Sequence, residues 1–303
     1  MNEPTAFLNN SWVSPAEVVV SATDAGFMLG VTVAEQLRTF GGKIFRLEGH
    51  LDRLQNSLDT LGIENPLSRD RLSEVIHELA AHNHALLPAG SDLGIAIFVT
   101  PGSLSTYETE QCSPVIGIHS REIAFSSFAN LYTTGQSLAI PQVRQTPLEC
   151  WPRELKIRSR AHYYLADREA KRIDPTSRAV MVDLDENVME ATTANLVAYK
   201  QSEGIICPPR HLILPGISLA MLETLAEQLN IPMNHRNISA TELAEVDEVL
   251  LTSTSPCVLP CVTLDNRPIQ TGKPGPVFEQ LITAWSESVG MDIREQAERF
   301  AAL

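Results

Sequence analysis

The sequence predicts a two-domain protein of the α/β (α+β) class. Leucine spacing typical of helices and short apolar runs typical of strands occur in both halves of the chain. Its 303 residues are enough for two domains, and the small, polar stretch SSFANLYTTGQ lies between the halves. We therefore expect a small N-terminal α/β domain at 1–125, an interdomain linker at 126–135 and a larger C-terminal domain at 136–303.

The first half is predicted to mix strands with two helices. Residues 18–45 are interpreted as strands, with GGK as a tight hairpin turn. Leucines at 51, 54, 58 and 61 recur at steps of three and four, which predicts a helix with one buried face that ends at Gly62; His50 and Arg53 fall outside that leucine stripe. A second helix at 71–87 and an apolar strand at 93–102 follow.

The second half begins with a predicted helix at 155–173, which carries Lys156. A hairpin is predicted next, with AVMVDL and VMEATTANLVAY as its two strands around the turn DEN. An amphipathic helix is expected just after LPGIS, residues 214–218. The apolar run at 245–264 reads as a strand broken by a hydroxyl-rich turn, and a polar C-terminal helix follows.

Composition limits the partners. A net charge of −14 argues against nucleic acid or an anionic membrane, because both repel an acidic surface. The N-terminus lacks a basic segment before an apolar core, and no apolar run approaches the length of a membrane span, so we expect a cytoplasmic protein that binds small molecules. Five cysteines, odd in number and scattered, are typical of reduced thiols.

No metal site is predicted. DLDEN resembles the start of a calcium loop, but Val188 stands where the loop needs glycine and Ala194 where it needs a bidentate glutamate. The pair in CVLPC has no second pair or histidine cluster near it, so buried packing explains these two thiols.

Lys156 is the first candidate for chemistry. Arg153, Arg158 and Arg160 lie close to it in sequence, and neighbouring cations make a lysine amine more nucleophilic by lowering its pKa. Alone, a lysine in PRELKIRSR is more typical of a solvated surface charge.

Two turns are candidate anion sites. In LPGIS the amides of Ile217 and Ser218 begin a helix, where the dipole favours an anion; the alternative is a simple serine cap. In LTSTSP the residues from Thr252 to Ser255 offer hydroxyls and amides at the end of a strand, which suits phosphate or carboxylate oxygens. A structural turn would have the same composition.

Taken in order, these motifs resemble the class IV aminotransferases, the pyridoxal-phosphate family that includes branched-chain and D-amino-acid aminotransferases and aminodeoxychorismate lyase. The matching stretches are TDAGFMLGVTVAEQLRTF, GHLDRLQNSL, LKIRSRAHYYLADREA, DENVMEATTAN, LPGIS and LTSTSP. Their order and spacing hold from about residue 6 to about residue 275. The resemblance implies the family's two-domain fold, with the cofactor in the interdomain cleft, and a homodimer.

The resemblance also implies a role for each matching residue. Lys156 would be catalytic, forming the Schiff base with pyridoxal phosphate and moving the substrate Cα proton. Glu190 would keep the pyridine nitrogen protonated, with Asn195 orienting that neighbourhood, and Arg53 would pair with the phosphate. Without the family, Glu190 is a solvated hairpin carboxylate and Arg53 a surface charge. The predicted cofactor-binding residues are Arg53, Lys156, Glu190, Asn195, Ile217, Ser218 and Thr254.

Departures from the family pattern leave the substrate open. Ala34 replaces an aromatic residue, Ala161 stands where branched-chain enzymes have a tyrosine, and Gly94 and Pro101 stand where relatives have an arginine. No arginine or lysine occurs between Arg71 and Arg121, so the substrate carboxylate must bind elsewhere. Turn amides near Thr254 or arginines such as Arg38, Arg144 and Arg160 are the alternatives. The predicted substrate-binding residues are Leu29, Ala34, Arg38, Arg160 and Ser255.

The expected activity is transfer of an amino group between an amino acid, possibly branched-chain, and a 2-oxo acid. Two alternatives remain open at this point. The same residues would suit a lyase that eliminates pyruvate from aminodeoxychorismate to give 4-aminobenzoate, and a non-catalytic homologue would retain only the fold.

Overall fold

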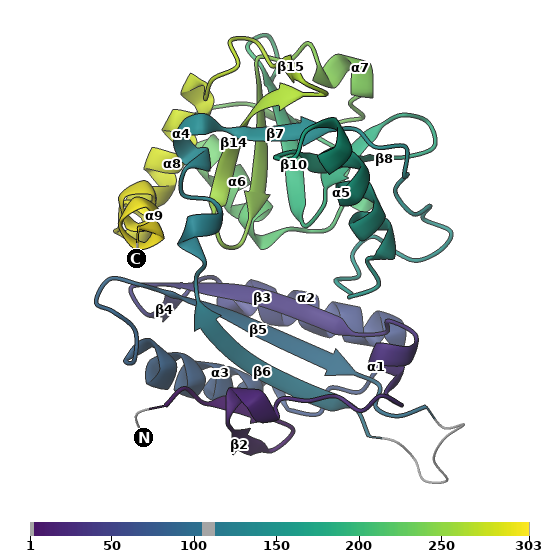
Figure 1. Cartoon of the computed structure of the whole chain (residues 1–303), viewed down its shortest axis with the longest axis vertical. Coiled ribbons are helices and arrows are strands. Elements are labelled where there is room, and N and C mark those ends of the chain that lie inside the picture. The colour runs from purple at the N-terminus through teal and green to yellow at the C-terminus, as the bar shows by residue number, and fades with distance from the viewer. Residues whose placement is uncertain (1–2, 105–112, 303) are drawn as a thin grey trace. The chain divides into compact units, whose positions relative to one another are not determined.

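The computed structural model describes residues 3–104 and 113–302, which fall into two compact units (Figure 1). Unit 1 comprises Met1–Ile123 with Glu154–Ser159, and unit 2 comprises Ala124–Arg153 with Arg160–Leu303. The chain therefore passes from one unit to the other three times. The expected domain limits of 1–125 and 136–303 stay a prediction; within the expected linker the structure has the 3-10 turn η2 (Phe125–Ser127) and the helix α4 (Leu131–Thr134).

Unit 1 is built on an antiparallel six-stranded sheet in the order β2-β1-β6-β5-β3-β4. Side chains alternate between its two faces along each strand. The strands are β1 (Ala6–Leu8), β2 (Ser11–Val13), β3 (Val33–Phe40), β4 (Lys43–Ile44), β5 (Leu93–Thr100) and β6 (Val115–Glu122).

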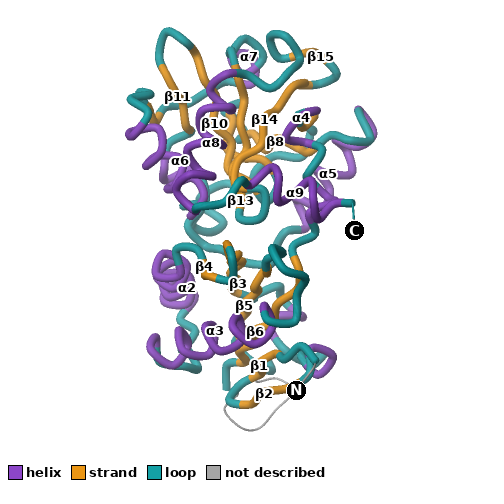
Figure 2. The backbone as a smooth tube through the Cα atoms, turned by 90° about the vertical axis from the view of Figure 1, so that its left-hand side faces the viewer, coloured by secondary structure: helices purple, strands orange, loops and turns teal. Residues whose placement is uncertain are grey.

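Two helices cover one face of this sheet, α2 (Leu47–Leu61) and α3 (Arg69–His84) (Figure 2). Leu51, Leu54 and Leu58 of the α2 leucine stripe are buried in the core, as the spacing predicts, and Leu61 is partly buried against it. α2 ends at Gly62, whose φ of 65° suits glycine. Both predicted helices are therefore confirmed. Burial of these leucines against the strands stabilises this face, together with the buried apolar residues of α3.

The prediction of strands throughout residues 18–45 is wrong for its first part. Ala25–Met28 forms the short helix α1, because the Asp24 side chain caps it by accepting a hydrogen bond from the Gly26 amide at 2.6 Å. β3 and β4 form the predicted hairpin, and Gly41 and Gly42 supply the positive φ angles of its turn.

Unit 2 is built on a nine-stranded sheet. β9 pairs with both β8 and β10, so β10, β13, β14, β7, β8 and β9 form a closed ring of hydrogen-bonded neighbours. Apolar residues of these strands fill its inside. The strands are β7 (Gln136–Ala139), β8 (Arg178–Val182), β9 (Val188–Ala191), β10 (Ala194–Lys200), β11 (Gly204–Cys207), β12 (Met233–His235), β13 (Glu248–Ser253), β14 (Cys257–Leu264) and β15 (Arg267–Pro268).

Helices of unit 2 pack on the outside of the ring. α5 (Ala161–Ile173) contacts β7 and β8, α6 (Ile217–Gln228) contacts β13, and α8 (Pro276–Val289) contacts β14. The predicted polar C-terminal helix is two helices, α8 and α9 (Ile293–Ala301), because Gly290 with a φ of 66° ends the first. α7 (Ala240–Leu243) is a single turn.

Two further predictions in the second half need correction. The helix expected at 155–173 begins only at Ala161, because the preceding residues are extended and pair with β3. The second strand of the predicted hairpin is two strands, since Thr193 adopts a φ of 61° and turns the chain between β9 and β10. The hairpin of β8 and β9 and the helix at LPGIS are confirmed.

Candidate active site

Lys156 lies in unit 1, on an extended segment beside the start of β3. Its carbonyl accepts a hydrogen bond from the Ala34 amide at 2.9 Å, and its amide donates to the Ser57 hydroxyl of α2 at 3.3 Å. The next residue, Ile157, pairs with Val33. Backbone bonds to both β3 and α2 therefore position the lysine.

A buried charged network lies between the same two elements. Glu35 of β3, 1% exposed, accepts hydrogen bonds from Arg53 at 2.7 and 2.8 Å and shares one with the His50 ring at 2.7 Å. Burial by itself raises the pKa of Glu35, but the charge and hydrogen bonds of Arg53 and His50 outweigh it and lower the pKa to about 2. Burial lowers the pKa of His50, and the charges of Arg53 and Lys156 act in the same direction.

The network explains why His50 and Arg53 lie off the leucine stripe of α2. Both are buried, and they face the carboxylate of β3 rather than solvent. Arg53 is a predicted site residue, whereas Glu35 and His50 are not. The available signal was their presence in the two matching motifs, GVTVAE and GHLDR.

Unit 2 contains a row of polar side chains on the outside of its ring. Glu190, Asn195 and Thr252 are directly paired across β9, β10 and β13. Their sequence neighbours Ala191, Leu196 and Leu251 fill the inside of the ring, so the polar row points outward. All three residues are buried, and the Thr252 hydroxyl has no hydrogen-bond partner among the described residues.

Two side chains donate to one oxygen of the Glu190 carboxylate. Its Oε1 accepts from the Tyr163 hydroxyl at 2.6 Å and from the Gln145 side-chain amide at 3.2 Å. Burial, and then the Glu190 charge, raises the pKa of Tyr163 well above its usual range, so the phenol keeps its proton and acts as a donor. Arg153, 8% exposed, adds a positive charge near both groups. None of Tyr163, Gln145 and Arg153 is among the predicted cofactor-binding residues.

The start of α6 is anchored to the same row. Asn195 donates to the Leu214 carbonyl at 2.9 Å, and the Leu214 amide donates to Glu190 Oε2 at 3.4 Å. A Cβ on Gly216 would lie 1.9 Å from Asn195 Oδ1, so only glycine permits this close approach. Ile217 and Ser218, the first residues of α6, are thereby held beside the polar row.

The predicted substrate residues are divided between the units. Leu29, 61% exposed, Ala34 and Arg38 belong to unit 1, whereas Arg160 and Ser255 belong to unit 2, where Ser255 and Thr254 form the turn after β13. The Arg38 guanidinium is buried and lies 3.9 Å from the centre of the Phe40 ring. This packing accounts for Arg38 without a substrate.

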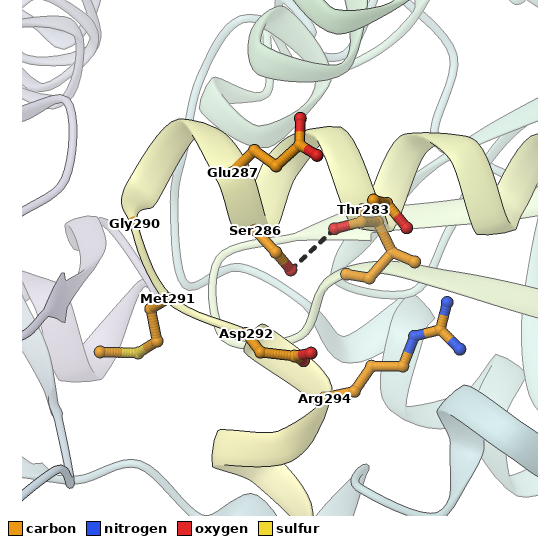
Figure 3. Close-up of a pocket in the computed structure, with 8 residues that line it drawn as sticks. Thr283, Ser286, Glu287, Gly290, Met291, Asp292 and Arg294 are labelled. Atoms are coloured by element: carbon orange, nitrogen blue, oxygen red, sulfur yellow. Dashed lines mark hydrogen bonds between the residues drawn. The ribbon is translucent and has the colours of Figure 1, made fainter.

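One pocket of unit 2 lies apart from the polar row. It has a volume of about 500 Å³ and lies where α8 meets α9, at Gly290 (Figure 3). Inside it the Ser286 hydroxyl donates to the Ile282 carbonyl at 2.8 Å, and Arg294 pairs with Glu279. None of the predicted site residues lines it.

Comparison with known proteins identifies the family. The family model for class IV amino-transferases matches residues 32–264, which cover more than half of the chain and include Lys156, Glu190 and Arg53. The chain belongs to the class IV aminotransferases. Its reaction class is therefore the transfer of an amino group.

Relatives of this class IV aminotransferase extend over nearly its whole length. A D-alanine aminotransferase of Staphylococcus aureus (strain N315) is 28% identical over 280 residues, which are 91% of this chain and 94% of the relative. A T.th. branched-chain amino acid aminotransferase, complexed with N-(5'-phosphopyridoxyl)-L-glutamate, has the same fold, with a TM-score of 0.84 at 23% identity and 95% of each chain covered. A putative branched-chain amino acid aminotransferase of Thermotoga maritima is 26% identical, with a TM-score of 0.77 over 94% of this chain and 95% of that one.

Family membership implies pyridoxal phosphate as the cofactor, and the residues present fit such a group. Unit 1 brings a lysine near a buried arginine network. Unit 2 keeps a buried carboxylate in a row with a buried hydroxyl that has no partner among the described residues. The lysine would suit the aldehyde of pyridoxal phosphate, the arginine and the hydroxyl its phosphate, and the carboxylate its ring nitrogen.

Within residues 3–104 and 113–302, no helix is long and apolar enough to cross a membrane.

Proposed function

We propose that this class IV aminotransferase binds pyridoxal phosphate through Lys156 and moves an amino group between an amino acid and a 2-oxo acid. One observation carries the proposal: a buried carboxylate, Glu190, is held in a fixed orientation by Tyr163 and Gln145. Burying a carboxylate is costly unless it is bonded, so this arrangement suits a carboxylate that must remain charged.

Lys156 would hold the cofactor through its Nζ atom and move the proton at the substrate Cα. A cofactor so bound supplies an electron-withdrawing ring that stabilises negative charge at that carbon. The amine has to be positioned before it can act as a base, and the backbone bonds of Lys156 to Ala34 and Ser57 restrict its location.

The remaining predicted residues would fix the cofactor. Glu190 would accept a hydrogen bond from the pyridine nitrogen and favour its protonated form. Arg53 would bind the phosphate, and the amides of Ile217 and Ser218 with the Thr254 hydroxyl would add donors. Glu35 and His50 would act as positioning residues, because Glu35 accepts hydrogen bonds from the Arg53 guanidinium and His50 shares a hydrogen bond with Glu35.

The test combines a covalent and an optical measurement. Borohydride reduction of the protein loaded with pyridoxal phosphate should attach the cofactor to Lys156, as identified by peptide mass spectrometry. Lys156→Ala should lose both this adduct and turnover, whereas Lys171→Ala, a change at an exposed lysine of α5, should retain both. Adduct formation and turnover in Lys156→Ala would contradict the assignment.

The visible absorption of the bound cofactor can also show which amino acids the enzyme uses as donors. The D-alanine aminotransferase relatives support D-alanine as one donor to test, and branched-chain L-amino acids are the second. A donor that is used should bleach the visible band of the bound cofactor without any acceptor present. Glu190→Gln should leave cofactor binding largely intact and slow this bleaching at least about 10-fold.

We also propose a homodimer and a cytoplasmic location. Support for the dimer comes from three exposed apolar side chains of unit 1, since Val19, Phe27 and Leu29 are each more than 60% exposed. Light scattering should give twice the mass of one chain, and Phe27→Ser should shift the protein toward the monomer. A wild-type monomer would contradict the dimer, and cell fractionation tests the location.

A further inference from the structure

The chain turns between β13 and β14 through residues 254–256, which we term the hydroxyl turn. Ser253 and Cys257 pair at its base, so three residues connect the two strands. Cys257 adopts a φ of 63°, in the left-handed region that favours glycine. Such a strained conformation persists only where surrounding contacts fix the backbone.

Tyr132 of α4 supplies one of these contacts. Its side chain is fully buried, and its hydroxyl donates to the Pro256 carbonyl at 2.8 Å. The same peptide plane carries the Cys257 amide, so the bond also fixes the orientation of the peptide that enters the left-handed residue. Pro256 fixes its own φ and favours an extended conformation at Ser255. The backbone is therefore restricted at three successive residues.

The packing of α4 holds Tyr132 in place. α4 lies against β14 (Figure 1). Gly135, the residue after α4, has a φ of 76°, and a Cβ there would lie 2.1 Å from Val262 Cγ1, so only glycine permits this contact. The Phe128 ring meets the Tyr132 ring edge-on, with 6.0 Å between their centres. The Tyr132 hydroxyl therefore reaches the hydroxyl turn from a fixed position.

Two features that suit an anion lie beside the hydroxyl turn. Thr252, two residues before Thr254, has a buried hydroxyl with no hydrogen-bond partner among the described residues. Its paired residue Asn195 donates to the Leu214 carbonyl, which brings the start of α6 to the same row. A buried donor without a partner and the positive end of a helix both favour a negatively charged ligand.

We propose that Tyr132 is a positioning residue, which holds the hydroxyl turn in the shape that binds an anionic group. This inference rests on the proposed function, in which Thr254 donates to the cofactor phosphate. Amides and hydroxyls that are already in place bind an anion without a further cost for ordering the turn. The anion is either the phosphate of the cofactor or the carboxylate of the substrate, because both present oxygens to the same donors.

Tyr132→Phe removes only the anchoring hydroxyl and distinguishes these two sources. Equilibrium dialysis would measure Kd for pyridoxal phosphate and for pyridoxal, which lacks the phosphate. If the turn holds the phosphate, the variant should raise Kd for pyridoxal phosphate about 10-fold and leave Kd for pyridoxal unchanged. If the turn holds the substrate carboxylate, both Kd values should stay the same. The donor concentration for half-maximal bleaching should then rise about 10-fold at an unchanged maximal rate.

Two further variants complete the test. Tyr164→Phe, at a 65% exposed tyrosine of α5, is the matched control and should equal the wild type in every measurement. Glycine adopts the left-handed conformation without strain, so adding Cys257→Gly to Tyr132→Phe should restore part of the lost affinity. The double variant also serves if Tyr132→Phe does not fold.

The outcomes separate this inference from the proposed function. Equal weakening of pyridoxal phosphate and pyridoxal in Tyr132→Phe would mean a general loss of structure and would overturn the inference. No change in either Kd or in the bleaching by the donor would also overturn it. Absence of the borohydride adduct at Lys156 in the wild type would overturn the proposed function instead.

Discussion

The buried network of unit 1 makes a quantitative prediction about stability. Glu35→Gln keeps the size of the side chain but removes the charge that pairs with Arg53 and His50. Arg53 is only 6% exposed, so it would remain buried without a counter-charge. Breaking a buried pair by removing one partner is strongly destabilising.

The magnitude follows from the pKa of Glu35. Its value falls from 4.5 to about 2 in the folded protein, and this shift of about 2.5 units corresponds to about 3 kcal/mol of stability. Because the folded pKa is the lower one, this stabilisation is fully present above pH 4.5 and is lost as the pH falls toward 2. Glu35→Gln should therefore lower the free energy of unfolding by about 3 kcal/mol at pH 7, and the difference from wild type should shrink between these two pH values.

Urea unfolding followed by circular dichroism measures this difference, and hydrogen exchange of the α2 amides should assign the loss to unit 1. The matched control is Glu48→Gln at the start of α2, whose partner Arg69 forms an exposed ion pair with it at 2.5 Å. That change should cost at most about 1 kcal/mol. A loss in Glu35→Gln no larger than in the control, or one that does not diminish in acid, would refute the reasoning.

Three further changes test the structure. Gly216→Ala should lower the melting temperature, at a cost of about 1–3 kcal/mol, because the added Cβ would lie 1.9 Å from Asn195 Oδ1; an unchanged calorimetric melt would contradict that close approach. Tyr163→Phe removes a donor from the buried Glu190 carboxylate and should cost about 1–3 kcal/mol in urea unfolding, so a neutral result would mean that another donor replaces it. Leu54→Ala, at a position 1% exposed, should cost about 2–5 kcal/mol, and a smaller loss would show that the core of unit 1 collapses around the gap.

The elements with strong local signals were predictable from sequence. The leucine spacing of α2 and the glycine at its end specify that helix, because periodicity and a left-handed cap are local properties. The order of the short motifs predicted the family, which the family model confirms. Local signals also misled: a lysine followed by a helical pattern suggested one helix over 155–173. Instead, Lys156 and Arg158 form backbone hydrogen bonds with Ala34 and Thr32, more than 120 residues earlier, and the Lys156 amide donates to Ser57 of α2.

The sequence by itself determined which residues are available: a lysine, a hairpin glutamate, a helix arginine and their order along the chain. Only the tertiary structure decided their partners. Glu35 meets Arg53 because β3 and α2 pack together, and Glu190 meets Tyr163 because α5 lies on the outside of the ring. Charge and burial depend on neighbours that are distant in sequence, so periodicity and spacing cannot supply them.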